Sequence, residues 1–354
     1  MEIPSSIIIS NYYNYNNYIK LALASFFYGI IKWEATMKNV VVFGGGTGLS
    51  CLLSGLKLFP LNVTAVITMS DDGKSTGQLK KELDIPAVGD IGKVLMAMAN
   101  VDNDFIDLLG YRFSKESFLQ NHPIRNILLA ALIDIKGDIT EATKYMSNML
   151  NINGTVLPLT EEKIDLIGYG KNKKKFFGET KVSKNIKEID KLDYDHKIKI
   201  NKDIINRITD ADLIIFSPGS LYTSVIPHLL SNEVQKALDN SKAPLMYVMN
   251  LVTQPGETDK MSASDHIKVL NSYLRNRKID VAIANNARID KNTINNYIKK
   301  ENKSIVRIDK KNIEKEKVNL IEDNIFTIDE FGAIRHDSLR TAYLIFSYLM
   351  EDIK

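Results

Sequence analysis

The 354-residue chain has one cysteine, one tryptophan and a formal net charge of only +3. The single cysteine, Cys51, excludes a disulfide framework and a cysteine-based zinc site, and it fits a reducing compartment. The five histidines do not pair at the spacing of metal ligands. No Gly-x-Ser-x-Gly elbow occurs, so covalent nucleophilic catalysis finds little support in the sequence. The composition is that of an ordinary globular protein, which we expect to be cytoplasmic.

Long apolar runs are also absent. The longest uncharged apolar stretch near the start, Leu21 to Ile31, has eleven residues, whereas a membrane-spanning helix needs about 20. The basic region and cleavage site of a signal peptide are missing. Because Met37 is followed by Lys38 and then by an apolar run, we interpret Met37 as the natural start and residues 1–36 as an extension outside the fold. A membrane tether is the alternative.

Positive charge is concentrated in two segments. Residues 171–202 hold eleven lysines against five acids, and residues 287–317 hold ten basic residues against five acids. Neither segment shows the stacking aromatics or the module that nucleic-acid binding requires. We interpret both as solvated surface and expect no nucleic-acid partner.

A strand, a glycine-rich turn and a helix follow one another near the start of the expected fold. Val40–Phe43 is a short β-branched run typical of a buried parallel strand, and leucines at helical spacing begin at Leu49. The residues between them are Gly44, Gly45, Gly46, Thr47 and Gly48. Glycines allow a ligand to approach the backbone, and a helix N-terminus attracts anions. The strict dinucleotide fingerprint requires glycine where Leu49 stands, so we expect no NAD.

Two carboxylates follow the second expected strand, Val63–Met69. Asp71 and Asp72 can accept hydrogen bonds from ribose, hold a divalent ion such as Mg²⁺ or act as a base. A helix cap is the alternative role. The nearby Gly73-Lys74-Ser75 resembles the end of a P-loop, but Thr68 stands where that motif requires glycine.

The remaining pattern alternates strands with helices, which predicts an α/β fold with a doubly wound, mostly parallel, Rossmann-like sheet. We expect strands at 211–216, 244–251, 281–284, 305–308 and 325–327. We expect helices at 91–100, capped by Asp90, and at 102–111, 124–135, 140–150 and 338–350. Residues 151–200 predict a small β-rich insertion within a single domain covering 37–354. Residues 217–220 between a strand and an expected helix suggest a second anion site.

Several stretches together resemble the CofD-like family, and within it the YvcK-type, gluconeogenesis-factor branch. They are VVFGGGTGLSCLLSGL at 41–56, TMSDDGKSTGQLKKEL at 68–83, ADLIIFSPGSLYTSVIP at 211–227 and NLVTQPGETDKMSASDH at 250–266. Shorter matches at 86–91, 126–132 and 334–337 extend the resemblance, in order, over 37–350.

The resemblance implies two functions. CofD itself is a transferase that moves a 2-phospholactyl group from a nucleotide-activated donor to a deazaflavin with Mg²⁺. The YvcK-type branch binds nucleotide sugars of the UDP-N-acetylglucosamine class and links carbon metabolism to cell-wall precursor supply and cell shape. The sequences of the glycine loop and of residues 253–259 favour the regulatory binding protein, and the transferase is the alternative. We expect a homodimer, no membrane span, and a cell-wall precursor enzyme as partner.

The resemblance also implies the ligand contacts. They are Gly44, Gly45, Gly46, Thr47, Gly48, Asp71, Asp72, Asn126, Pro218, Gly219, Ser220, Asn250, Thr253 and Gln254. Asp71 and Asp72 would hold the metal ion if the transferase interpretation applies. The chain departs from the family pattern at four positions, Lys74, Arg125, Met261 and Asn296.

Overall fold

The computed structural model describes residues 37–351, except 115, 118, 171–172, 291–292, 296–297, 299–300 and 331. The chain divides into two units, Met1–Met37 and Lys38–Lys354. The extension expected at 1–36 and the departure at Asn296 lie outside the described residues. The fold described below is that of the second unit.

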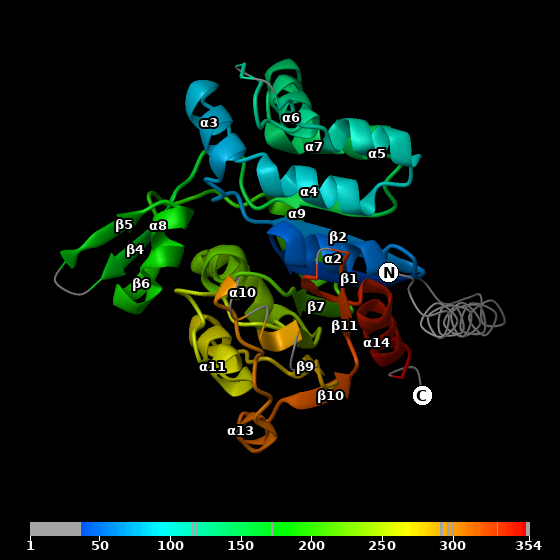
Figure 1. The fold of residues 1–354 in the computed structure, drawn as a ribbon, viewed down its shortest axis with the longest axis vertical. Helices are drawn as coiled ribbons and strands as arrows, with labels where there is room; N and C mark the ends of the chain where they lie inside the picture. The colour runs from blue at the N-terminus through cyan, green and yellow to red at the C-terminus, as the bar shows by residue number, and fades with distance from the viewer. Residues whose placement is uncertain are drawn as a thin grey trace. The chain divides into compact units, whose positions relative to one another are not determined.

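A seven-stranded sheet forms the centre of the fold, in the order β10-β9-β8-β7-β1-β2-β3, with every neighbouring pair parallel (Figure 1). The first strand, β1, is Lys38–Gly44, and the others are β2 Leu61–Ile67, β3 Thr155–Pro158, β7 Leu213–Phe216, β8 Leu245–Val248, β9 Val281–Asn285 and β10 Asn319–Asp323. The β-branched residues of the central strands are buried, as expected for a sheet covered on both faces. The predicted doubly wound α/β fold is confirmed.

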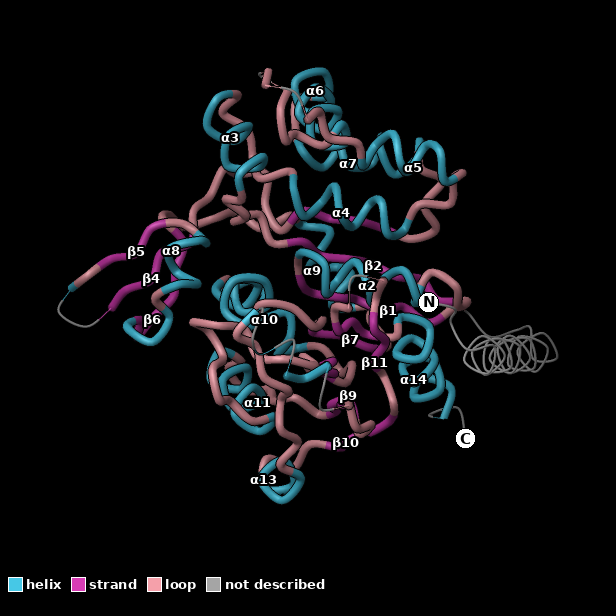
Figure 2. Tube along the Cα trace, viewed as in Figure 1, coloured by secondary structure: helices cyan, strands magenta, loops and turns pink. Residues whose placement is uncertain are grey.

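The helices surround this sheet, and α4 to α7 gather on the side of β2 (Figures 1 and 2). Their bounds are α2 Gly46–Leu56, α3 Lys74–Glu82, α4 Gly89–Met98, α5 Asn103–Gly110, α6 Ile124–Lys136, α7 Ile139–Met149, α9 Lys202–Thr209, α10 Asn232–Asn240, α11 Ala263–Tyr273, α13 Lys310–Lys315 and α14 Ser338–Glu351. Helix α2 packs against both α4 and α14. Helix α2 therefore buries Leu49, Leu52, Leu53 and Leu56, which recur on one face at helical spacing.

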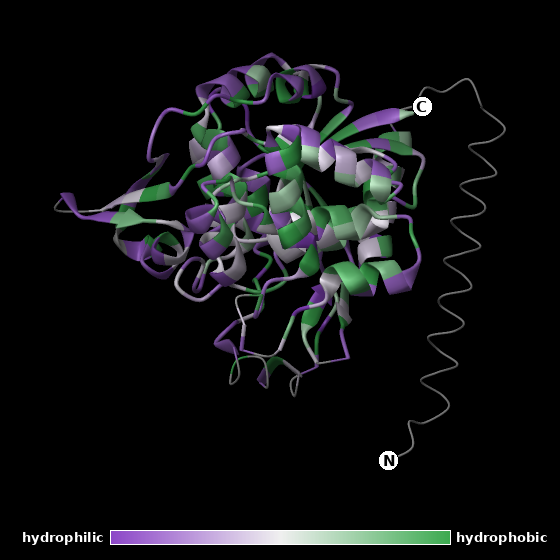
Figure 3. Cartoon of the chain, turned by 90° about the horizontal axis from the view of Figure 1, so that it is seen from above, coloured by the Kyte–Doolittle hydropathy of each residue, from purple (hydrophilic) through white to green (hydrophobic). Residues whose placement is uncertain are grey.

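A second, antiparallel sheet has the order β5-β4-β6, formed by β4 Leu166–Gly170, β5 Lys175–Phe177 and β6 Ile189–Tyr194. The short helix α8, Glu179–Lys184, lies between β5 and β6. Figure 3 shows hydrophilic residues at the outer end of this sheet. The expected insertion at 151–200 starts too early, because Thr155 to Pro158 pair with β2 and so belong to the main sheet.

Several local expectations were wrong. Asp90 does not cap a helix, because α4 begins at Gly89 and places Asp90 inside its first turn. Residues 221–230 form a π-helical turn and then a 3₁₀ turn instead of an α-helix, since Pro227 has no backbone N–H to donate. Residues 305–308 make only isolated bridges, at Ile305 and Arg307. The edge strand β10 was not expected because its polar residues hide the strand pattern.

A separate two-stranded antiparallel sheet, formed by β11 Phe326–Ile328 and β12 Ile334–His336, precedes α14. Across the helices of the described residues, none combines the length and apolar character needed to cross a bilayer.

Candidate functional site

Two loops meet where the strand order reverses. Strand β1 lies between β2 and β7, so the chain leaves β1 in one direction and reaches β7 in the other. The Gly44–Gly48 segment, called the glycine loop, covers the last residue of β1 and the first residues of α2, and residues 217–220 follow β7. In doubly wound sheets, ligands bind outside the carboxyl ends of the strands at this switch point. We call this region, formed by the carboxyl ends of β1, β2, β7 and β8, the carboxyl edge.

The glycines of the first loop allow the two loops to touch. A Cβ on Gly48 would lie 2.1 Å from the carbonyl oxygen of Pro218, and one on Gly44 would lie 2.0 Å from Oγ of Ser217. Gly46 has a φ of +64°, which glycine adopts readily. At least three of the four glycines are therefore required by packing or by backbone conformation.

Asn250 holds the second loop from the end of β8. Its side-chain Oδ1 accepts from the backbone N–H of Gly219 at 2.7 Å, and its Nδ2 donates to the Gly219 carbonyl oxygen at 2.7 Å. One amide side chain thus satisfies both polar groups of a residue whose φ is +149°. This places Asn250, Gly219 and Pro218 at one location beside the glycine loop.

Asn250→Asp is expected to weaken this clamp, because the second carboxylate oxygen would face the Gly219 carbonyl oxygen. We expect the free energy of unfolding to fall by about 2 kcal/mol, as for a lost half-buried hydrogen bond with an unfavourable contact. Urea unfolding measures this change. Asn103→Asp is the charge-matched control, because Asn103 is exposed in the first turn of α5. Equal stabilities of the two variants would contradict the clamp.

Asp90 brings a carboxylate to the N-terminus of α2. A Cβ on Gly45 would lie 2.7 Å from Oδ2 of Asp90, so the absence of a side chain at Gly45 makes room for this acid. Burial raises the pKa of Asp90, and Asp71 adds to the rise, whereas Lys93 and a hydrogen bond from the Gly46 backbone oppose it. Lys93 Nζ lies 2.8 Å from Asp90 Oδ1. A buried carboxyl group of the protein, paired with Lys93, therefore lies beside the glycine loop.

Glu179 adds a third acid from α8. Burial, with Asp71 and then Asp90, raises the pKa of Glu179 well above its ordinary value, although Thr223 Oγ1 donates to Glu179 Oε1 at 3.1 Å. Burial disfavours the charge of Lys93, but the neighbouring acids outweigh it and raise the pKa of Lys93. A diphosphate bound at this edge would therefore need a cation or a proton beside it.

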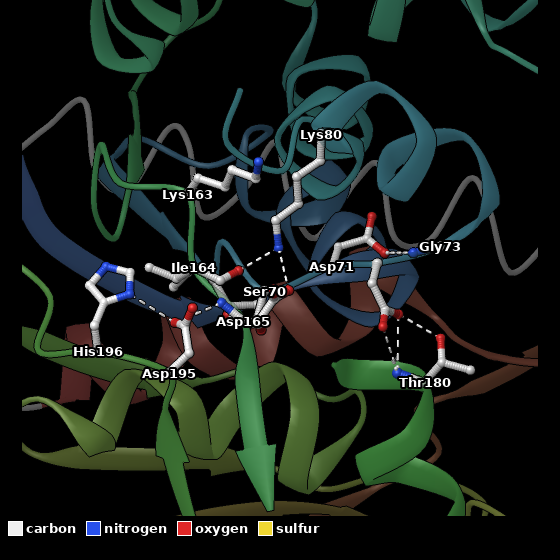
Figure 4. A network of polar contacts seen from close by, with 12 residues as sticks. Ser70, Asp71, Gly73, Lys80, Lys163, Ile164, Asp165, Thr180, Asp195 and His196 are labelled. Carbon is white, nitrogen blue, oxygen red and sulfur yellow. Dashed lines mark hydrogen bonds and ion pairs between the residues drawn. The ribbon is translucent and has the colours of Figure 1, made fainter. Parts of the chain in front are cut away.

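The paired acids of the sequence have different surroundings. Asp71 Oδ1 accepts from the Gly73 backbone N–H at 2.9 Å (Figure 4). Asp72 accepts from both the backbone N–H and Oγ1 of Thr180. Asp72 thus fastens the start of α8 to the loop after β2. Among the described residues, no group of three or more acids, histidines or cysteines is arranged to hold a metal ion.

Asp71 fits a Mg²⁺ ion better than Asp72 does. Its Oδ2 is not committed to the Gly73 turn and reaches within 2.3 Å of where a Gly89 Cβ would stand, next to Asp90. Carboxylate oxygens are the ligands that Mg²⁺ prefers, and the ion commonly keeps several waters. Asp71 therefore keeps one carboxylate oxygen outside the Gly73 turn, whereas both oxygens of Asp72 face Thr180.

Buried lysine contacts tie α3 to the base of the small sheet. Lys80 Nζ donates to the Ile164 carbonyl oxygen at 2.5 Å and to Asp165 Oδ1 at 2.6 Å (Figure 4). The loop after β2, α3 and the segment leading to β4 are thereby joined at the carboxyl edge.

A second polar network surrounds Glu257, which is 4% exposed. Ser220 Oγ donates to it at 2.6 and 2.8 Å from its two oxygens, and Gln254 Nε2 donates at 3.0 Å. Ser183 Oγ from α8 donates at 2.7 Å. Burial raises the pKa of Glu257, and the serine hydrogen bonds oppose the rise. The predicted residues Ser220 and Gln254 therefore meet around an acid that the sequence did not single out.

The other predicted contacts lie in different settings. Thr47 is exposed at the start of α2, and Asn126 is buried in the first turn of α6. Thr253 is buried, and its Oγ1 accepts from the Ser304 backbone N–H at 3.0 Å. Its side chain thus holds the segment around Ser304.

A recess of about 420 Å³, lined by Asn39, Asn62 and Arg207 among others, opens at the amino ends of β1 and β2. It lies at the opposite ends of these strands from the glycine loop, so it is not part of the carboxyl edge.

The comparison with known families matches residues 40–326 to the family described as 2-phospho-L-lactate transferase CofD. The chain belongs to the CofD family. This CofD-family chain is 36% identical to the gluconeogenesis factor of Bacillus subtilis, covering 88% of this chain and 98% of that protein. It is 37% identical to the gluconeogenesis factor of Halalkalibacterium halodurans, covering 87% and 95%.

Solved structures agree with the fold of this CofD-family chain. A crystal structure of a UPF0052-family protein from Bacillus halodurans matches with a TM-score of 0.83 at 35% identity, covering 88% of this chain and 99% of that chain. A further crystal structure of a Bacillus halodurans protein matches with a TM-score of 0.84 at 36% identity, covering 88% and 100%. The resemblance inferred from the motifs is thereby confirmed at the level of the family.

Proposed function

We propose that this protein binds a nucleotide sugar of the UDP-N-acetylglucosamine class at the carboxyl edge and acts as a regulator. The observation that carries the proposal is the meeting of two strand-end loops at the switch point, with Asn250 fixing Gly219 beside the glycine loop. Open backbone N–H groups at a helix N-terminus suit a diphosphate. Carboxylates such as Asp71 suit ribose and sugar hydroxyls.

The names of the relatives supply the regulatory part of the proposal. Two relatives that this chain matches over nearly their whole length are called gluconeogenesis factor. From these names we propose a role in carbon metabolism, and from the family resemblance a link between carbon metabolism, cell-wall precursor supply and cell shape. A homodimer, a cell-wall precursor enzyme as partner and a cytoplasmic location remain predictions.

Titration calorimetry with UDP-N-acetylglucosamine tests the binding. We expect saturable heat and recovery of the intact nucleotide sugar by mass spectrometry. Mg²⁺ is expected to tighten binding, because the acids Asp71, Asp90 and Glu179 disfavour a bare diphosphate. No heat at millimolar ligand, with and without Mg²⁺, would remove this function.

A matched pair of variants tests the role of the acid. Asp71→Asn is expected to reduce the effect of Mg²⁺ on affinity on the order of tenfold, as for a lost metal ligand. Asp107→Asn removes an exposed acid from α5 and is expected to leave the effect unchanged. An equal response of both variants to Mg²⁺ would contradict a metal at the carboxyl edge.

The second candidate is the CofD-type transferase, and the raised pKa values of Asp90 and Glu179 beside Asp71 favour it. Acids with raised pKa values at a binding edge are typical of proton-transfer sites. The test is incubation with a nucleotide-activated phospholactyl donor, a deazaflavin and Mg²⁺, followed by mass spectrometry. Absence of the transferred product would leave the binding protein as the function.

A further inference from the structure

Five side chains form a continuous hydrogen-bond chain that runs from α3 to the start of α6, and among them only Asn126 is one of the ligand contacts that the family resemblance implies. Asn126 Nδ2 donates to Ser75 Oγ at 3.2 Å, and Ser75 Oγ lies 3.0 Å from His122 Nδ1. His122 Nε2 lies 3.2 Å from Gln78 Oε1, and Gln78 Nε2 donates to Glu82 Oε1 at 3.0 Å. The contact between Ser75 and His122 could not be predicted from the sequence, because the two residues are 47 positions apart.

The carboxylate at one end fixes the direction of every bond. A carboxylate can only accept, so the amide nitrogen of Gln78 faces Glu82 and its carbonyl oxygen faces His122. Neutral His122 therefore carries its proton on Nε2 and presents a lone pair on Nδ1. Ser75 must then donate its hydroxyl proton to Nδ1.

The other end of the chain agrees with this direction. Asn126 directs its amide nitrogen to Ser75, and its Oδ1 is buried without a hydrogen-bond partner among the described residues. Asn126 and His122 are each 3% exposed, so both are held in place by packing. The Ser75 hydroxyl therefore donates its proton to the imidazole of His122 and accepts a hydrogen bond from the side-chain amide of Asn126.

Ser75 lies beside the carboxyl edge. It is the second residue of α3, directly after the Asp71–Gly73 turn, and the N-cap Gly73 provides no side-chain cap. The neighbouring Thr76 Oγ1 and Asp71 Oδ2 would lie 2.1 and 2.3 Å from a Cβ on Gly89, at the start of α4. The start of α3 thus lies beside the carboxylate of Asp71, and the first N–H groups of a helix favour a negatively charged group.

We propose that Ser75 is a nucleophile, activated by His122, for attack on a phosphorus centre. Ser75 Oγ forms a bond to phosphorus while its proton moves to His122 Nδ1. The leaving group departs with the electron pair of its bond to phosphorus, and the N–H groups of α3 stabilise the phosphoryl oxygens. Gln78 and Glu82 hold the imidazole in the required tautomer. This chemistry goes beyond ligand binding and does not depend on the identity of the nucleotide sugar.

An alkyl fluorophosphonate carrying a fluorophore tests the nucleophile in the full chain. The Oγ–P bond replaces the P–F bond, fluoride leaves, and peptide mass spectrometry locates the adduct on Ser75. His122→Gln is expected to slow labelling on the order of 100-fold, the usual effect of losing a general base. Ser54→Ala is the control, because Ser54 Oγ donates only to the Cys51 carbonyl oxygen on α2. It is expected to be labelled like the unmodified protein.

Variants of Gln78 separate activation from a merely structural link. Gln78 is exposed, so its replacement is expected to leave the melting temperature nearly unchanged. Gln78→Glu places a carboxylate on His122 Nε2 and should speed labelling on the order of tenfold, whereas Gln78→Leu should slow it to a similar degree. Absence of an adduct on Ser75 in the folded protein, or equal labelling rates for the two Gln78 variants, would overturn the proposal.

Discussion

Gly48→Ala is expected to lower the free energy of unfolding by about 3 kcal/mol, at the upper end of the cost of overpacking. The new Cβ would stand 2.1 Å from the carbonyl oxygen of Pro218, 2.6 Å from its carbonyl carbon and 3.1 Å from the Gly219 nitrogen. These are backbone atoms, so relief requires α2 to move away from the loop after β7. The same movement would separate the two loops of the carboxyl edge, and nucleotide-sugar binding should be lost with the stability.

Gly110→Ala provides the control for this measurement. Gly110 is the last residue of α5, and a Cβ there would meet no atom within 4 Å. Alanine also has the higher helix propensity, so this variant should be unchanged or more stable by about 0.5 kcal/mol. Urea unfolding curves with unchanged slopes would assign the difference to the native state. A Gly48 variant as stable as the Gly110 variant would show that the contact with Pro218 can relax.

The parts of the site that follow a strand directly could be predicted from the sequence. The Gly44–Gly48 loop and residues 217–220 each stand next to a buried apolar run, and parallel strands bring their carboxyl ends to one edge. Asn250 was found in the same way, since it follows β8. For these residues, a position directly after a predicted strand was enough to predict that they lie at the carboxyl edge.

The acids that complete the edge could not be found in this way. Glu179 reaches Asp71 and Asp90 only because the small antiparallel sheet positions α8 against the loop after β2. Asp90 stands at the start of an expected helix, where an acid usually caps. The burial of Asp90 beside Gly45 depends on how α4 packs against α2, and this packing cannot be predicted from the local sequence.

The buried acids also affect which ligands can bind at the glycine loop. The sequence predicts an anion-binding site at this loop, yet the structure places the carboxyl group of Asp90 near the N-terminus of α2. A ligand phosphate must therefore compete with a carboxylate or arrive with a cation. For this reason the response of binding to Mg²⁺ is more informative than affinity alone.

His228 is expected to make the folded protein lose stability as the pH falls. The side chain is fully buried, its Nδ1 lies 3.1 Å from the Val225 carbonyl oxygen and its Nε2 lies 3.0 Å from the Val66 carbonyl oxygen. A neutral imidazole has one N–H, so only one of these contacts is a hydrogen bond. Burial nevertheless dominates and lowers the pKa of His228 to about 4, although both carbonyl groups oppose it.

The sign of the effect follows from the two pKa values. An unfolded histidine titrates near pH 6.5, so between about pH 6.5 and 4 the unfolded chain binds a proton that the folded chain does not. The stability contributed by neutral His228 is fully present above pH 6.5 and is lost progressively toward pH 4, by about 3 kcal/mol in total. His336, whose Nε2 lies 2.9 Å from the Met249 carbonyl oxygen, has a pKa lowered to about 4 and acts in the same direction.

His228→Gln isolates this contribution, because glutamine offers one donor and one acceptor without titrating. The variant should be less stable at pH 7.5, but its stability should fall less steeply than that of the unmodified protein between pH 6.5 and 4.5. Urea unfolding across this range gives both slopes, and their difference should approach one proton. The raised pKa values of Asp90, Glu179 and Glu257 act in the opposite direction, yet they are common to both proteins and cancel in the difference. Parallel curves for the two proteins would mean that His228 is already protonated when folded, with both carbonyl groups accepting from the imidazolium.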